Sequence, residues 1–122
     1  MKAWTEAELD AIDRADELRV AGERADGSLR KLVVVWQVRV GDDVYIRSVR
    51  GPSGGWYRGV RDQDRGRIES GGVTKDVAFE RDSSHDAEID AAYRAKYGRG
   101  SSVDAITTPT AKETTLRVSP GE

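Results

Sequence analysis

The sequence contains no cysteine and a single histidine, His85. Without cysteine the protein has no disulfide bond, no thiol nucleophile and no zinc site built from thiolates. A transition-metal site would have to be built mainly from carboxylates, and the aspartates and glutamates do not follow the spacing of a calcium-binding loop. We therefore expect no dedicated metal site.

A long apolar segment is also lacking. No run of about 18 apolar residues occurs, so the sequence predicts no transmembrane helix and no membrane partner. Residues 1–25 are acidic and amphipathic, whereas a secretory signal has a basic start followed by an apolar stretch. We expect a cytoplasmic protein.

Large apolar side chains are scarce. The 122 residues suffice for one domain, 1–122. Leu, Ile, Val and Phe together make up only about a fifth of them, which is close to the lower limit for a packed core, and charged residues make up 34%. A small domain with so thin a core gains stability by burying surface between two copies, so we expect a homodimer.

The net charge of −2 is unevenly distributed. Residues 30–67 carry nine basic and four acidic side chains, whereas the segments on either side are acidic. A basic segment within an acidic protein does not fit general nucleic-acid binding, but it suits a local site for a phosphate-bearing small molecule. Ion pairs between neighbouring strands explain the same residues equally well.

The N-terminal third begins with a helix signal. Thr5 and Glu8 have the spacing of a capping box, so we expect a helix that begins at Thr5 and ends near Asp16. A short strand follows at 18–20, and the sequence of residues 25–28 is typical of a turn.

A β-hairpin is the strongest signal in the chain. Val-rich residues 32–40 and 44–50 flank a turn at 41–43. A three-residue turn pairs Trp36 with Ser48, whereas a slip of one residue pairs Trp36 with Val49. In the first register one core face carries Val34, Trp36, Val38, Val40, Val44 and Ile46. We accordingly expect Trp36 and Trp56 to be largely buried and Trp4 to be partly exposed.

The second half predicts further elements of both kinds. We expect a short helix or turn at 56–64, a second hairpin from 67 to 80 around Gly71–Gly72, and a helix from Ser83 to Gly98. Residues 101–111 have the composition of a loop, and 114–118 that of a last strand. About six antiparallel strands with flanking helices indicate a small α+β barrel, because closure protects the strand edges.

The sequence resembles a bacterial family, the domain of unknown function 2255, over nearly its whole length. The matching segments are Trp4-Thr5, Glu8-Leu9, Ala25–Gly27, Leu29-Arg30, Trp36–Asp43, Tyr45–Val49, Trp56–Gly59, Gly66–Ile68, Gly71–Val73, Ile89–Arg94 and Thr114–Arg117. The family name carries no activity.

A more distant resemblance is to the deazaflavin-dependent nitroreductase-like proteins, which are flavin-binding split barrels. It rests on the strand order and on the Trp56-Tyr57 pair, which enters a short helix after the central hairpin. The resemblance implies a six-stranded antiparallel split barrel and a bound FMN or deazaflavin. Residues 25–31 stand where that family has Gly-Arg-Lys-Ser-Gly, and the Asn that follows the aromatic pair there is missing here.

One segment has the residue types of a nucleotide site. A glycine-rich loop at 51–55 leads into a helix, where free backbone N–H groups and nearby guanidinium groups bind phosphate. Two aromatic side chains follow, which suit the wall of a flat ring. The candidate residues are Arg47, Ser48, Arg50, Trp56, Tyr57 and Arg58. In the structural alternative the glycines only turn the chain and Trp56 closes the barrel end.

No catalytic side-chain constellation is present. Ser84, His85 and Asp86 have the residue types of a hydrolase triad, but adjacent positions at a helix start do not align a nucleophile with its base. Two functions are compatible with this sequence. One is a flavin- or deazaflavin-binding oxidoreductase, in which the cofactor supplies the hydride chemistry. The other is a non-enzymatic dimeric binding or interaction module that has lost the cofactor, which the missing phosphate motif and Asn favour.

Overall fold

The strands of the computed structural model, which describes residues 3–121, form one antiparallel sheet with the order β2-β1-β5-β6-β7-β4-β3. They are β1 (Leu18–Gly22), β2 (Val33–Val35), β3 (Gln37–Val40), β4 (Asp43–Ile46), β5 (Arg65–Ser70), β6 (Val73–Arg81) and β7 (Leu116–Pro120). The helices are α1 (Glu6–Arg14), a 3-10 turn η1 (Gly51–Ser53), α2 (Gly55–Gln63), α3 (Asp86–Tyr97), α4 (Ser101–Ile106) and α5 (Pro109–Lys112).

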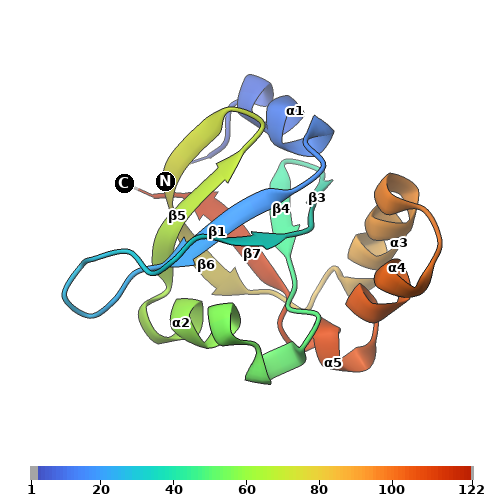
Figure 1. The fold of residues 1–122 in the computed structure, drawn as a ribbon. Helices are drawn as coiled ribbons and strands as arrows, with labels where there is room; N and C mark the ends of the chain where they lie inside the picture. Colours follow the sequence, from blue (N-terminus) through green and yellow to red (C-terminus); the bar gives the residue numbers. More distant parts are fainter. Residues whose placement is uncertain (1–2, 122) are drawn as a thin grey trace.

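The two edge strands of this sheet, β2 and β3, are separated along the chain by Trp36 alone. The sheet therefore curls until its edges approach each other, and Trp36 lies at the seam of a split barrel. The helices are placed around it, with α1 at one end, α2 at the other, and α3 and α4 beside β3 and β4 (Figure 1). The predicted α+β barrel is confirmed, with seven strands in residues 3–121 instead of six. The additional strand arises because the expected strand 32–40 is divided at Trp36.

The register of the central hairpin differs from both registers considered above. Val40 pairs with Asp43 and Val38 pairs with Tyr45, so the turn is one residue shorter than expected. Side chains alternate between the two faces of a strand, so this one-residue shift in pairing changes which side chains of the two strands share a face. Val44 and Ile46 lie in the barrel core, whereas Val38 and Tyr45 pack on the opposite face with Ile89, Tyr93 and Ile106. The single core face predicted for this hairpin is wrong.

Several local predictions hold. The α1 capping box is present in both directions between Thr5 and Glu8. The second hairpin turns at Gly71–Gly72, and Ile68, Val77 and Phe79 point into the core. Gly98 ends α3.

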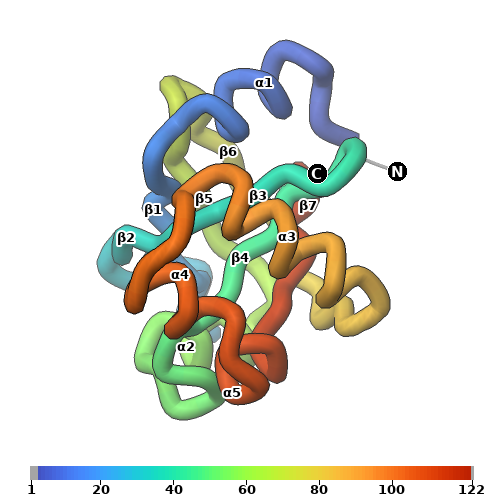
Figure 2. Tube along the Cα trace, turned by 90° about the vertical axis from the view of Figure 1, so that its right-hand side faces the viewer, coloured from blue at the N-terminus to red at the C-terminus, as the bar shows by residue number. Residues whose placement is uncertain are grey.

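The C-terminal third differs more. Helix α3 begins at Asp86 rather than at Ser83, because the N-cap position is occupied by His85 and no side chain, Ser83 included, caps the helix. The segment expected to be a loop contains α4 and α5. The last strand begins at Leu116, two residues later than predicted. Helix α4 lies next to the barrel seam, and Figure 2 shows β2, α4 and α2 around one end of β4.

The order of tryptophan burial is the reverse of that predicted. Trp4 is only 8% exposed, and its ring N–H donates a 2.9 Å hydrogen bond to the carbonyl of Val118. Trp36 and Trp56 are half-buried. The N-terminal segment therefore closes one end of the barrel, while the other two rings border a cavity.

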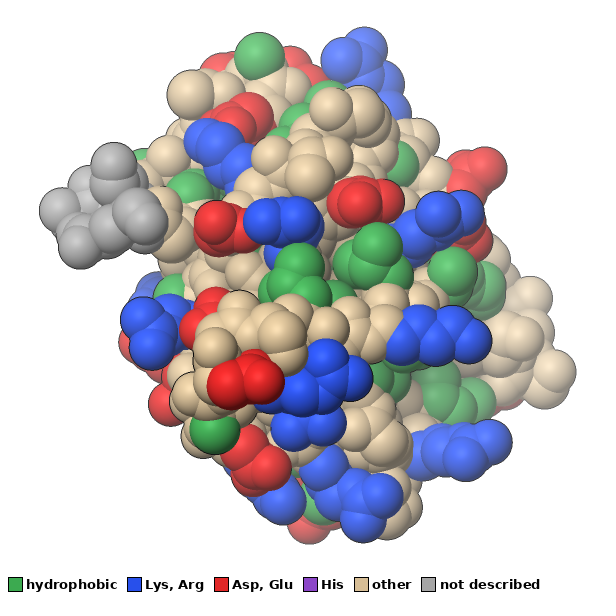
Figure 3. Space-filling view, turned by 60° about the vertical axis from the view of Figure 1, so that its left-hand side comes forward, with side chains coloured by type: hydrophobic (Ala, Val, Ile, Leu, Met, Phe, Trp, Pro, Cys, Tyr) green, Lys and Arg blue, Asp and Glu red, His purple; other side chains and the backbone are tan. Residues whose placement is uncertain are grey.

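The charged surface contains cross-strand ion pairs of the kind considered for the basic segment. Arg67 on β5 pairs with Asp76 on β6, and Arg39 on β3 contacts Glu6 and Asp10 of α1. Basic and acidic side chains are interspersed on the face shown in Figure 3. Ion pairing thus accounts for part of the basic segment. Among residues 3–121 no helix is long and apolar enough to cross a membrane.

Candidate functional site

A cavity of about 600 Å³ lies at the barrel seam. Strand β2 and Trp36 form one wall, the segment Arg47–Arg50 after β4 and the start of α2 form the floor, and α4 forms the opposite wall. Its lining residues are Val33–Trp36, Arg47–Arg50, Gly54–Trp56, Ser102, Ala105 and Ile106.

This cavity collects the exposed apolar side chains of the protein. Within residues 3–121 the exposed large hydrophobic residues are Val33, Val34 and Val49, and all three line it. Val34 and Val49 are each about half exposed, at 51% and 52%. Small soluble proteins rarely leave such groups together at the surface unless the patch binds something. The cavity is therefore the candidate binding site of the protein.

The floor of the cavity has the properties of an anion site. Gly54 precedes α2 and provides no side-chain cap, so the first N–H groups of this nine-residue helix lack side-chain acceptors. Gly54 and Gly55 both line the cavity, together with Ser48 and Arg50. Arg50 is exposed and pairs with no acidic group among the described residues. A helix N-terminus next to an unpaired guanidinium favours a bound anion.

Gly54 packs closely against the buried side chain of Ser48. A Cβ atom at position 54 would lie 2.3 Å from the hydroxyl oxygen of Ser48, so a larger residue would require the Ser48 side chain to move.

Arg47 is fully buried and has other partners. Its Nε donates to the Thr115 hydroxyl at 2.9 Å, and Nη2 lies 3.0 Å from Asp86. Nη1 donates to Asp90 and to the carbonyl of Ile106, and Nη2 also donates to the Asp86 carbonyl. All five N–H groups are thus occupied. Arg47 ties β4 to α3, α4 and β7, and through Ile106 it positions one wall of the cavity.

The carboxylate of Asp90 completes this buried network. Lys112 of α5 contacts it at 2.9 Å on the side opposite Arg47. Burial acts to raise the pKa of Asp90, but hydrogen bonds from Lys112 and Arg47 outweigh burial and hold the pKa below its ordinary value of 3.8. Asp90 is therefore ionised, and the network is an ion cluster with two cations and the carboxylates of Asp86 and Asp90.

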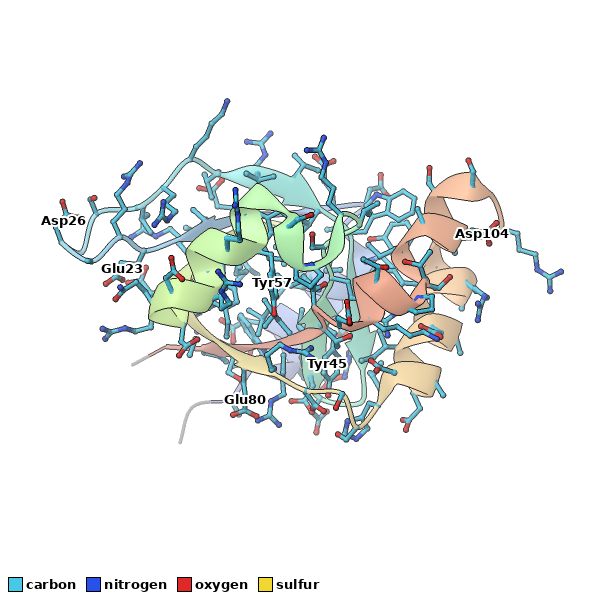
Figure 4. The ribbon with its side chains drawn as sticks, turned by 90° about the horizontal axis from the view of Figure 1, so that it is seen from below. Glu23, Asp26, Tyr45, Tyr57, Glu80 and Asp104 are labelled. Atoms are coloured by element: carbon cyan, nitrogen blue, oxygen red, sulfur yellow. The ribbon has the colours of Figure 1, made fainter. Side chains whose placement is uncertain are left out.

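The aromatic pair expected to hold a flat ring is divided. Trp56 lines the cavity, and Tyr57, edge-on to it, belongs to the barrel core. Figure 4 places Tyr57 next to α2 toward the middle of the molecule. Arg58 is exposed and does not line the cavity. The structure thus brings together Arg47, Ser48, Arg50 and Trp56 from the predicted set, and it places Tyr57 and Arg58 elsewhere.

Trp36 also lines the cavity, although the sequence predicted it to be a core residue. Its ring stacks on Tyr97 of α3, with centroids 4.1 Å apart and planes inclined by 2°. Its carbonyl accepts a 2.8 Å hydrogen bond from the Tyr93 hydroxyl. These contacts hold the ring rigidly at the seam. The α4 residues were also missed, because that segment was read as a loop.

The remaining chemical motifs lie elsewhere. The Ser84 hydroxyl contacts both Asp82 and the Nδ1 of His85. In a hydrolase triad the histidine lies between the serine and the carboxylate, whereas here the serine lies between the other two. None of these three side chains lines the cavity. In the described part of the chain no three His, Cys, Asp or Glu residues are placed to hold a metal ion. A second hollow, of about 810 Å³ over β5–β7, contains the exposed ion pairs Arg67–Asp76 and Arg117–Glu80.

A curled antiparallel sheet with a cavity at its open seam defines the class of split-barrel proteins. The chain belongs to the family described as an uncharacterized protein conserved in bacteria, the domain of unknown function 2255, whose model matches residues 8–118. No curated protein matches the sequence.

Solved structures support the same fold class. An F420 reductase is 13% identical, with a TM-score of 0.62 over 98% of this chain and 97% of that one. The haem storage protein HutZ from Vibrio cholerae is 14% identical, with a TM-score of 0.65 over 100% and 92%. An FAD- and haem-binding protein from Mycobacterium smegmatis is 18% identical, with a TM-score of 0.54 over 98% and 67%. At these identities the similarity establishes the fold alone.

Proposed function

We propose that the protein binds a flavin or deazaflavin nucleotide in the seam cavity and acts as an oxidoreductase. The observation that carries the proposal is the combination of an apolar cavity at the seam with an anion site at its floor. Trp36, Trp56 and the exposed valines suit a flat heterocycle, and Arg50, Ser48 and the first amides of α2 suit its phosphate. The bound ring would supply the hydride chemistry, and the chain would bind and orient it.

The lining favours a flavin over a haem, although structurally similar proteins bind each. Haem iron takes an axial ligand from histidine, cysteine, methionine or tyrosine. Among residues 3–121 none of these residue types lines the cavity, and His85 lies with Asp82 and Ser84 outside it. A flavin needs no such ligand, because it is held by ring contacts, hydrogen bonds and phosphate contacts.

The alternative is a dimeric module that binds no cofactor. It is favoured by residues 25–31, which lack the phosphate motif of the nitroreductase-like proteins. In this segment Arg30 lies against Gly59 of α2, where an added Cβ would approach its side chain to 2.7 Å. The two functions differ in whether the seam cavity binds a nucleotide.

Filling the cavity provides the direct test. Ser102 and Ser101 are adjacent exposed residues at the start of α4, and only Ser102 lines the cavity. We expect Ser102→Trp to weaken FMN or deazaflavin binding at least tenfold and Ser101→Trp to leave it unchanged, measured by fluorescence titration. If neither nucleotide binds the unmodified protein, the cofactor-free module is correct.

The anion site gives a second prediction. Arg50→Ala should weaken FMN binding by roughly 1.5–3 kcal/mol, the usual contribution of a hydrogen bond to a charged group. Riboflavin, which lacks the phosphate, should bind both proteins alike. The control is Arg58→Ala, because Arg58 is exposed but does not line the cavity. Equal FMN affinity for the Arg50→Ala variant and the unmodified protein would place the phosphate elsewhere.

We also propose that the protein is a homodimer. The thin core and the exposure of Val33, Val34 and Val49 support this, since a second copy would cover apolar surface. Light scattering at micromolar concentration should give the mass of two chains, and Val49→Asp should shift the mass toward one. A single-chain mass for the unmodified protein contradicts the proposal.

A further inference from the structure

The seam cavity follows the free edge of β2 rather than one of its faces. Successive side chains of a strand point to opposite faces, yet four consecutive residues, 33–36, line this cavity. A cavity that touches all four lies along the strand edge. Strand β2 pairs with β1 on one side only and ends the sheet, so its other edge has backbone groups without a strand partner.

The hydrogen bonds of β1 identify which residue of β2 faces this edge. The N–H of Glu23, which follows β1, donates to the carbonyl of Arg65 in β5. The carbonyl of Gly22 accepts from the N–H of Arg30, which lies on the β2 side. Because directions alternate along a strand, even-numbered residues of β1 face β2. Leu18 and Val20 are therefore the ones whose backbone bonds to β2.

Their partners in β2 are Val35 and Val33. Val34 lies opposite Arg19, which faces β5, so its N–H and carbonyl point out of the sheet along the cavity. The next outward-facing residue is Trp36, whose carbonyl already accepts from the Tyr93 hydroxyl. Val34 thus presents one donor and one acceptor side by side, next to the rigid Trp36 ring.

We propose that Val34 recognises the cofactor ring through a cis-amide edge, in which a ring N–H is adjacent to a ring C=O. The pyrimidine portion of flavins and deazaflavins carries such an edge, with N3–H between two carbonyls, and a haem has none. The proposal rests on the function proposed above and names the part of the ligand to which the cavity would hydrogen-bond. Contacts to the phosphate at the α2 end and to the pyrimidine edge at β2 would then hold the nucleotide at two separate points.

A methyl group on N3 removes the donor of this edge and leaves the rest of FMN intact. We expect N3-methyl-FMN to bind at least tenfold more weakly than FMN, and an FMN analogue modified at its benzenoid end to bind like FMN. If FMN and N3-methyl-FMN bind equally, the Val34 proposal is wrong while the proposed function stands. If no flavin or deazaflavin binds, both are wrong.

Proline at position 34 tests the protein side of this contact. It removes an N–H that the sheet does not use, so Val34→Pro should fold and lose at least tenfold in FMN affinity. Val34→Ala, which keeps the N–H and shortens only the side chain, should lose clearly less FMN affinity than Val34→Pro. Unchanged FMN affinity of a folded Val34→Pro variant overturns the proposal. A second pair of results would also overturn the proposal: Val34→Pro becomes monomeric, and N3-methyl-FMN binds the unmodified protein like FMN. The free edge of β2 would then pair with a second copy of the chain instead of with the cofactor.

Discussion

Replacing Arg47 with alanine should reduce the free energy of unfolding by about 3–5 kcal/mol, as expected when one partner of a buried ion cluster is removed. The substitution leaves the buried carboxylate of Asp90 and the half-buried carboxylate of Asp86 without the Arg47 guanidinium. It also removes the hydrogen bonds from Arg47 to the Ile106 carbonyl and the Thr115 hydroxyl. Urea unfolding at neutral pH measures the loss.

Arg67→Ala is the matched control. Arg67 also pairs with an aspartate, Asp76 at 3.0 Å, but both side chains are largely exposed to water. An exposed pair contributes only about 0–1 kcal/mol. If the two alanine variants lose the same stability, the buried cluster does not hold the helical segment on the barrel.

The stabilisation of the fold by the ion cluster of Arg47, Asp86, Asp90 and Lys112 should decrease as the pH is lowered. Because the folded protein holds the pKa of Asp90 below 3.8, the carboxylate stabilises the fold at pH values above the ordinary pKa. That stabilisation is lost as the pH falls through the lowered folded-state value. The difference in free energy of unfolding between the unmodified protein and the Asp90→Asn variant should therefore become smaller at acidic pH.

Local patterns were sufficient to predict much of the fold. The capping box of Thr5 and Glu8, the Gly71–Gly72 turn and the glycine after α3 each act over a few residues, and the structure contains all of them. The barrel was inferred from the number of short antiparallel strands, and the resemblance to split-barrel proteins pointed to the same fold. The hairpin register could not be obtained in this way, since a two-residue and a three-residue turn at 41–43 both suit the same sequence.

The candidate site was predicted less completely for the same reason. Residues 47–56 were identified because glycine, arginine and tryptophan are adjacent in the sequence. Arg47, however, finds its partners Asp86 and Asp90 about 40 positions later, and no local pattern indicates that pairing. Trp36 was assigned to the core because an uninterrupted strand alternates regularly, and its change of role follows from the division between β2 and β3.

The three tryptophans should contribute unequally to the stability of the fold, because Trp4 is buried while Trp36 and Trp56 border the cavity. We expect Trp4→Ala to cost about 3–5 kcal/mol, the range for truncating a buried tryptophan. Trp4 packs in the barrel core, and its ring N–H satisfies the carbonyl of Val118 in β7. Trp56→Ala should cost less than about half as much, because its half-buried ring borders the cavity and gains less from burial.

Trp4→Phe separates the two contributions of this residue. It retains most of the buried ring surface but leaves the Val118 carbonyl without its donor, which costs about 1–3 kcal/mol. Urea unfolding should therefore rank the variants Trp4→Ala, Trp4→Phe and unmodified protein in order of increasing stability. A Trp56→Ala variant less stable than Trp4→Ala would show that α2, rather than the N-terminal segment, closes the barrel.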